Sequence, residues 1–303
     1  MGHRSSSSVG ARAAAAAGTW DRFWFTPTTA GRLAVVRALA GLLGLLLAWS
    51  WAGDLDVWFG PDGIVSPQVL GAWRSPTALS LFDVARSSAA LWALFLVGVG
   101  LLGLLAVGAW TPLAAPLAAL FWASLLHRGP MLVGPADDVL AVILWCLVVG
   151  RSGDAFSVDR RLAAADARPS WRNGLALSLL RLHASVIAAA AVVSQLKADV
   201  WWNGTAAWWL AARESTRVDL TGVFAGSEIA TNLVTHAIVL FEIAFAAGVW
   251  NRWTRGPVAR AGLVGWPLIG LVAGEPMWGA AMAILAWACL PDDSAAGTAG
   301  PPL

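Results

Sequence analysis

Long apolar stretches recur along almost the whole chain, and they limit what it can fold into. Inside a lipid bilayer the backbone must satisfy its own hydrogen bonds, so a buried segment of this kind becomes a helix. A bilayer core about 30 Å thick needs about 20 helical residues to cross it. The sequence therefore predicts an all-α, polytopic transmembrane bundle with about eight spans (range six to eight), at 33–51, 89–108, 112–126, 138–149, 174–196, 231–250, 258–273 and 277–290.

Composition supports this class of protein. Hydrophobic residues make up 58% of the 303 residues and charged residues only 13%, with a mean hydropathy of +0.67, far outside the range of soluble domains. The net charge is only +2, and the arginines fall between the apolar stretches rather than in one basic patch. Neither feature indicates a nucleic-acid partner, and none is expected. No His/Cys cluster has metal-ligand spacing, so no metal site is expected.

The charged residues between the apolar stretches predict an orientation. If the N-terminus is cytoplasmic, the inner segments carry arginine with few acids, whereas the outer segments mix arginine with many acids. This asymmetry is the one the positive-inside rule describes. We therefore expect a multi-pass protein of the plasma membrane with both termini in the cytoplasm. Residues 19–293 would form the transmembrane domain, and residues 1–18 and 294–303 would be disordered tails.

The chain holds twenty basic residues, of which only Lys197 is a lysine. Arginine keeps its proton at any accessible pH, whereas a desolvated lysine can become a neutral amine and act as a base. Lys197 lies where an apolar stretch ends, close to Trp201 and Trp202. Two interpretations stay open at this stage: Lys197 is a functional base, or it only extends to the lipid headgroups.

The sixth apolar stretch carries polar residues on one face. Asn232, Thr235, His236 and Glu242 fall within about 120° of one another on a helical wheel. Lipid offers such groups no partners, so the face should turn toward the interior of the bundle. It would form either an interhelical hydrogen-bond seam or one wall of a polar cavity that it shares with Lys197.

Several motifs in the expected order resemble one family. The segment 194–206, which ends in Trp-Trp-Asn-Gly-Thr-Ala, resembles the signature of the vitamin K-dependent γ-carboxylase-like transmembrane (HTTM) domain. Further pieces that resemble this domain are the stretches at 22–27, 59–65, 156–159 and 236–242. The size of the chain is similar to the short bacterial branch of the family, which includes proteins that mature a secreted peptide in sporulation-delaying systems.

The resemblance implies a function and a set of roles. In the animal carboxylase a lysine in the matching block deprotonates reduced vitamin K, whose oxygenation produces the strong base that carboxylates a peptide glutamate. By resemblance, Lys197 would be the general base with His236 as its catalytic partner. Substrate-binding residues would be Trp201, Trp202, Asn232 and Glu242. The implied cofactor is a quinol of the menaquinol type, and the implied partners are the bilayer, a quinone and a secreted peptide.

Two functions of different classes follow from these observations. The first is a membrane enzyme, of the carboxylase or epoxidase kind, that acts on a lipid, a quinol or a secreted peptide at the outer membrane face. The second is a non-catalytic membrane partner that binds, matures or exports a secreted peptide. Replacing Lys197 by arginine separates them, because arginine keeps the charge and cannot serve as a base.

Overall fold

The structure is a computed structural model that describes residues 18–66, 69–70, 73–75, 78–163, 168–214, 216 and 218–291. The tails expected at 1–18 and 294–303 therefore lie outside the described residues, except for Gly18, which belongs to a helical segment over 18–25. The described part is all-helical. It contains no β-strand, and its one isolated β-bridge joins Thr28 to Ser170.

Eight helices of fourteen residues or more form the bundle in the described part of the chain. Their bounds are α2 (Gly31–Ala52), α5 (Ser88–Val107), α6 (Thr111–Arg128), α7 (Pro135–Val149), α9 (Trp171–Gln195), α13 (Glu228–Gly248), α14 (Arg255–Val272) and α15 (Pro276–Cys289). Short helices lie between them: α3 (Leu55–Phe59), η1 (Leu81–Val84), η2 (Ser152–Asp154), α8 (Val158–Leu162), α10 (Asp199–Trp202), α11 (Ala206–Ala211) and α12 (Thr221–Ala225).

Four of these helices are long and apolar enough to cross a bilayer. They are α2, α5, α9 and α13, with mean hydropathies between 1.7 and 2.5. The other long helices pack alongside: α6 lies against α5 and α7, and α15 lies against α14, α2 and α9. Each range expected from the apolar stretches corresponds to one long helix. The first and last residues of that helix lie within three residues of the expected ones.

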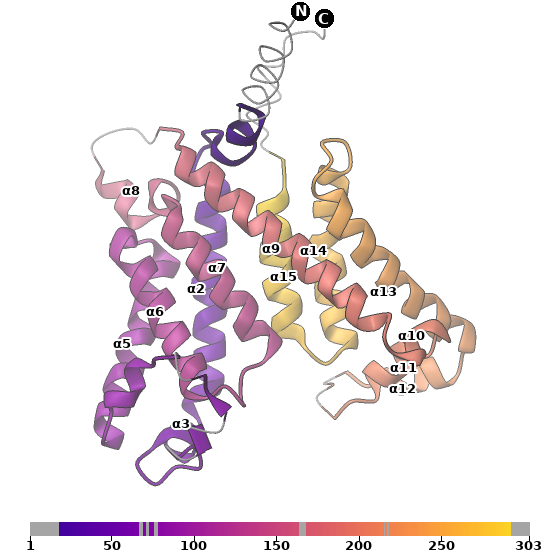
Figure 1. Ribbon diagram of the computed structural model, residues 1–303, viewed down its shortest axis with the longest axis horizontal. Coiled ribbons are helices and arrows are strands. Elements are labelled where there is room, and N and C mark those ends of the chain that lie inside the picture. Colours follow the sequence, from indigo (N-terminus) through magenta and orange to yellow (C-terminus); the bar gives the residue numbers. More distant parts are fainter. Residues whose placement is uncertain are drawn as a thin grey trace, which may run out of the picture.

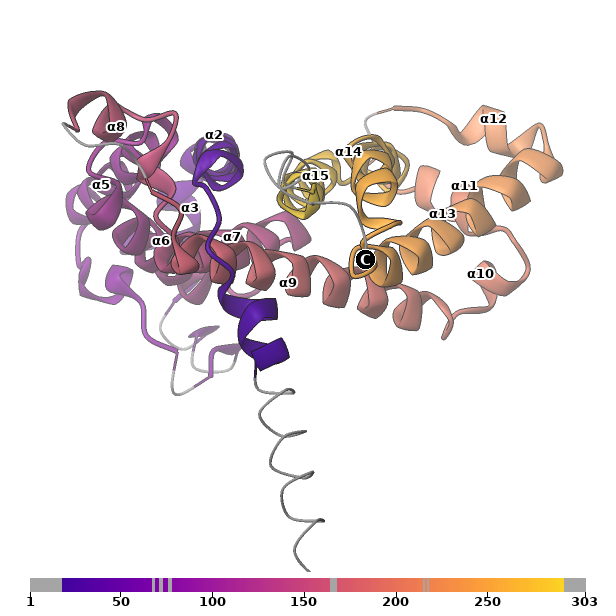
Figure 2. The same cartoon turned by 90° about the horizontal axis from the view of Figure 1, so that it is seen from above.

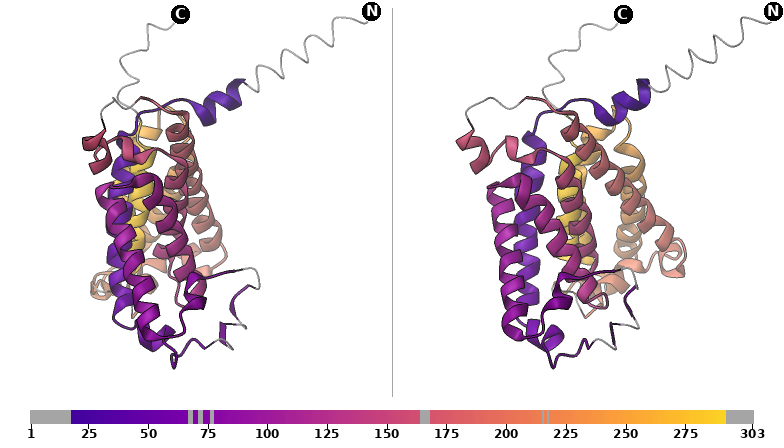
Figure 3. Two further views of the ribbon diagram at one scale, coloured as in Figure 1. Left: turned by 90° about the vertical axis from the view of Figure 1, so that its left-hand side faces the viewer. Right: turned by 60° about the vertical axis from the view of Figure 1, so that its left-hand side comes forward.

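The long helices run between two ends of the molecule (Figure 1). We call the end that carries α8 and the start of α9 the α8 end, and the end that carries α3, α10, α11 and α12 the α3 end. Figure 2, which looks along the bundle, shows α2, α5, α6 and α7 on one side and α13 and α14 on the other. Helices α9 and α15 connect the two groups through their contacts with α7 and α2, and Figure 3 shows the near-parallel packing of the first group.

Serine hydroxyls define where three of the long helices begin. The side chains of Ser87, Ser170 and Ser227 accept hydrogen bonds from the backbone N–H of Ala90, Arg172 and Ala230, respectively. Such caps satisfy one of the otherwise unpaired N–H groups of the first turn and contribute about 1 kcal/mol each. The sequence thus sets the start of α5, α9 and α13 independently of their apolar character.

The α8 end is held together by Arg37 and Asp159. Arg37 is fully buried in α2 and donates to the carbonyls of Ser152 at 3.2 Å and Phe156 at 2.7 Å. The Asp159 carboxylate accepts the backbone N–H groups of Trp110 and Thr111, both at 2.7 Å, and so caps the start of α6. The stretch 156–159 therefore has a structural role, which is to join α2 to α6.

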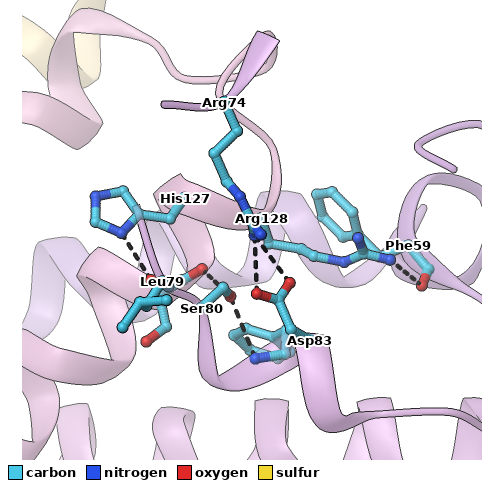
Figure 4. A network of polar contacts seen from close by, with 9 residues as sticks. Phe59, Arg74, Leu79, Ser80, Asp83, His127 and Arg128 are labelled. Carbon is cyan, nitrogen blue, oxygen red and sulfur yellow. Dashed lines mark hydrogen bonds and ion pairs between the residues drawn. The ribbon is translucent and has the colours of Figure 1, made fainter. Parts of the chain in front are cut away.

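Polar contacts also fold the loop between α2 and α5 onto the α3 end (Figure 4). Arg74 forms an ion pair with Asp83 at 2.9 Å, and Arg128 at the end of α6 donates to the Phe59 carbonyl at 3.3 Å. His127 bonds the Leu79 carbonyl through Nδ1 at 2.8 Å. These contacts fasten the loop to the last turn of α6.

The pKa of Asp159 yields a test of the α6 cap. Burial raises this pKa, but hydrogen bonds from Thr111 and Trp110 and the charge of Arg37 lower it by more, so it lies below the ordinary value. The stabilisation is therefore complete above the unfolded pKa of about 3.9 and is lost as the pH falls through the lower folded value. We expect Asp159→Asn to cost about 1 kcal/mol at pH 7.

Thermal unfolding of the detergent-solubilised protein at pH 7 and near pH 3 measures this effect. The gap between the unfolding temperatures of the parent and Asp159→Asn should shrink at the lower pH. Asp62→Asn is the matched control, because Asp62 is exposed in the loop that follows α3. A gap of equal size at both values of pH would contradict the capping role.

Candidate functional site

The six residues expected to form the site come from three neighbouring elements toward the α3 end. Lys197 lies in the turn between α9 and α10, and Trp201 and Trp202 are the last residues of α10. Asn232, His236 and Glu242 lie along α13, which packs against α9. Figure 1 shows α10, α11 and the first half of α13 next to one another. The fold thus brings the two polar segments of the sequence together.

Thr235 fastens the segment after α10 to α13. Its hydroxyl donates to the carbonyl of Gly204 at 2.9 Å and accepts the backbone N–H of Ala207, also at 2.9 Å. Thr235 is fully buried, so both bonds form away from solvent, where an unpaired group would cost about 1–3 kcal/mol. This contact docks the Asn-Gly-Thr-Ala segment onto the polar face of α13.

Gly204 makes this docking sterically feasible. Its φ is +77°, a backbone conformation that residues other than glycine rarely adopt. A methyl group built on Gly204 would overlap the Asn232 amide and lie 3.1 Å from Cε1 of His236. The backbone of the segment therefore rests directly on Asn232 and His236, at the level of the first turns of α13.

His236 uses one of its two ring nitrogens in a hydrogen bond within α13. Its Nδ1 lies 2.8 Å from the carbonyl of Asn232. A carbonyl only accepts, so Nδ1 carries the proton in this contact and Nε2 is an acceptor in the neutral ring. The side chain is exposed, so Nε2 is available to a hydroxyl or amide donor of a bound molecule.

Lys197 is exposed, and its side chain forms no hydrogen bond or ion pair with the described part of the chain. Trp202 is 66% exposed and donates its indole N–H to the Leu196 carbonyl at 2.9 Å, which holds α10 against the end of α9. Trp201 is half-buried and packs on the core. The two tryptophans therefore stand beside Lys197 without enclosing it, and it is not desolvated by protein atoms.

Glu242 occupies a different level of the site. It is six residues beyond His236, which at 1.5 Å per residue places it about 9 Å further along α13. Its side chain is 1% exposed and lies beside the side-chain amide of Gln195. Oε2 of Glu242 and Oε1 of Gln195 have no hydrogen-bond partner. A hydroxyl or ammonium donor between them would satisfy both oxygens.

Sequence reasoning missed the structural roles of two residues. Thr235 belongs to the predicted polar face, but its contact with Gly204 depends on how the loop folds back. Gln195 lies two residues before Lys197 in the segment that resembles the family signature, and its position opposite Glu242 depends on how α9 and α13 cross. A glutamine and a glutamate on two apolar helices are a signal that could have suggested this pairing.

We call the exposed side chains of Lys197, Trp202 and His236 at the α3 end the polar rim; the buried carboxyl of Glu242 lies further along α13. The described residues include no group of three or more His, Cys, Asp or Glu side chains placed to hold a metal ion. Comparison of the chain with models of protein families, with curated proteins and with solved structures finds no match. The architecture therefore defines only a class, that of all-helical proteins whose helices can cross a membrane. The resemblance to the HTTM family stays a prediction.

The Gly204 contact gives a second test. We expect Gly204→Ala to lower the free energy of unfolding by about 2 kcal/mol, because the left-handed conformation alone costs about 1–2 kcal/mol for a residue with a side chain and the methyl group would also displace Asn232. Gly222→Ala in α12 is the control, since a methyl group there meets nothing within 4 Å.

Chemical or thermal unfolding of both variants in the same detergent supplies the measurement. Limited proteolysis of the segment between α10 and α11 reports directly on docking, because an undocked segment is cut faster. Equal stability and equal cleavage of the two variants would mean that Gly204 does not hold the segment against α13.

Proposed function

We propose that this protein is a multi-pass protein of the plasma membrane with eight spans and both termini in the cytoplasm. Two observations support the proposal. The eight long helices follow one another from end to end of the molecule. The arginines at 22–32, 151–163, 168–172 and 252–260 lie at the α8 end, and such a concentration marks the cytoplasmic side by the positive-inside rule.

Accessibility of single cysteines tests this topology. Both native cysteines, Cys146 and Cys289, are buried, so they give little background. We expect Asp62→Cys at the α3 end to react with a membrane-impermeant maleimide in intact cells. Arg161→Cys at the α8 end should react only after the membrane is permeabilised. Labelling of Arg161→Cys in intact cells would overturn the orientation.

We further propose that the α3 end binds an amphiphilic molecule at the level of the lipid headgroups and acts on it, as the HTTM resemblance implies. The observation that carries this proposal is the docking of the Gly204 segment onto Thr235. In this proposal Lys197, the exposed indole of Trp202 and Nε2 of His236 together form the binding surface at this end. Aromatic surface next to a few polar groups is the usual composition of a small-molecule site.

A quinol fits the residues present. Its ring can pack on the exposed indole of Trp202, and a ring hydroxyl can donate to Nε2 of His236. A quinol bound here would supply a hydroxyl proton acidic enough for an amine to remove. The role of Lys197 in that step is to hold a neutral Nζ and take the proton, which requires that the bound ring and the surrounding lipid exclude water from the amine.

One observation favours a second function, a non-catalytic membrane partner that binds, matures or exports a secreted peptide. Lys197 is exposed and its side chain forms no ion pair with the described part of the chain, so its Nζ is accessible to an anionic partner. A charged lysine beside tryptophans is suited to an acidic or carboxyl-terminal group of a peptide. The same rim would then bind without reacting.

Lys197→Arg separates the two functions. A general base contributes about 10²–10⁴-fold to a rate, and arginine cannot supply one, so the enzyme predicts a loss of that size in oxygen-dependent quinol turnover by the protein in nanodiscs. Quinol binding should change by less than about threefold, because the indole of Trp202 and Nε2 of His236, which hold the ring in this proposal, are unchanged. Arg213→Lys, an exposed change at the same end, is the control.

The outcomes are distinct. Turnover by the parent that is lost in Lys197→Arg and kept in Arg213→Lys establishes the base. Turnover that survives Lys197→Arg contradicts it. If quinol binds neither the parent nor Lys197→Arg, a quinol is excluded as the ligand. A secreted peptide is then the ligand to test on the same two proteins.

A further inference from the structure

A cavity of about 1130 Å³ opens at the α8 end, away from the rim around Lys197. Its wall combines the start of α6, the end of α7, η2, α8 and the start of α9. The described residues that line it include four arginines and two aspartates: Arg151, Arg160, Arg168, Arg172, Asp154 and Asp159. No step in the proposed function uses this cavity.

The charge of the wall is positive after the contacts within the protein are counted. Asp154 forms an ion pair with Arg151 at 3.0 Å. Asp159 is occupied by the two N–H groups at the start of α6. Arg172 uses only Nε to hold the Val149 carbonyl, at 2.9 Å, which leaves the two terminal nitrogens of its guanidinium for another acceptor. Four arginines against two aspartates leave the described lining with a net charge of +2.

A buried hydroxyl on the wall points to a ligand independently of this charge. Ser152 is fully buried and lines the cavity, and its Oγ has no hydrogen-bond partner among the described residues. A buried hydroxyl without a partner is unfavourable by about 1–3 kcal/mol. An anionic oxygen that entered between Ser152 and the arginines would accept this O–H together with guanidinium N–H groups.

The remaining wall is apolar. It includes Pro112, Leu113 and Pro116 from α6 and Leu147 and Val148 from α7. Leu113 is 64% exposed, so the apolar wall continues onto the outer surface of the bundle. A ligand that matches the whole wall has an anionic head and an apolar tail. Among anionic heads, phosphate suits arginine best, because its oxygens accept paired guanidinium N–H groups.

We propose that this cavity binds a phosphate group carried on an apolar tail, which is the chemistry of an anionic phospholipid. Basic pockets at the cytoplasmic side of helical membrane proteins are places where such headgroups bind. A free phosphate compound shares the head without the tail. The apolar wall formed by α6 and α7 favours the lipid, and the experiment separates the two sources.

The test is a lipid titration of the full-length detergent-purified protein, followed by native mass spectrometry. The probes are phosphatidylglycerol, phosphatidylcholine, inorganic phosphate and glycerol 3-phosphate. The variant Arg160→Gln/Arg168→Gln removes two cavity guanidiniums. It keeps the ion pair of Arg151 with Asp154 and the hydrogen bond of Arg172 to Val149. Arg161→Gln/Arg252→Gln removes the same charge from residues of the same end that do not line the cavity.

We expect phosphatidylglycerol to bind the parent more tightly than phosphatidylcholine does. The cavity variant should bind it about tenfold more weakly, and the control variant by less than about twofold. Ser152→Ala should weaken binding about threefold without lowering the unfolding temperature of the unliganded protein, because the hydroxyl it removes has no partner there. This variant keeps the test valid if loss of two arginines impairs folding.

Three results would overturn the proposal: equal binding of the two lipids, equal weakening in the cavity and control variants, or unchanged binding in Ser152→Ala and the cavity variant together. Displacement of phosphatidylglycerol by inorganic phosphate or glycerol 3-phosphate at millimolar concentration would support the phosphate site and assign it to a soluble compound. If neither inorganic phosphate nor glycerol 3-phosphate displaces the lipid, the site is assigned to a membrane phospholipid.

Discussion

The fold depends on one constraint, that every backbone polar group must find a partner where lipid offers none. Within a helix the backbone groups bond one another, but the first N–H groups and the last carbonyls of each helix have no partner inside it. In this protein arginines satisfy many of the carbonyls at the α8 end. Arg172 donates to Val149, and Arg32 and Arg255 both reach the carbonyl of Leu290 at the end of α15. These contacts close the bundle at the α8 end.

This use of arginine explains why the chain has so few lysines. A guanidinium offers five donors in a planar fork and can reach two carbonyls at once, as Arg37 does with Ser152 and Phe156. The asymmetry of arginine between the ends is therefore partly structural, in addition to what it implies about orientation. The side chain of Lys197 caps no carbonyl and forms no hydrogen bond or ion pair with the described part of the chain. The described contacts thus give this side chain no structural role, and the proposed ligand at the rim would give it one.

The sequence predicts the long helices well and their contacts poorly. Apolar stretches set the helix positions because burial in lipid rewards each of them separately. The starts of α7, α9, α13 and α14 come three residues earlier than expected, because a polar first turn belongs to the helix but not to the apolar stretch. The partners of Thr235 and Gln195 could not be predicted, since each depends on which helix faces which. The polar face of α13 was recognised, whereas the loop that docks on it was not.

The exposure of Lys197 has a particular meaning in a membrane. At the end of a span a side chain outside the protein meets headgroups and the upper acyl chains, so lipid or a bound ring can remove the water that protein atoms do not exclude. Deeper in α13, Glu242 keeps an unpaired oxygen in a buried position, where only a donor brought by a ligand or by Gln195 can satisfy it. If the proposed ligand served both the rim and the buried carboxyl, it would need a polar head near Lys197 and a donor that reaches past His236. A molecule too short to meet both would leave Glu242 as a structural partner of Gln195.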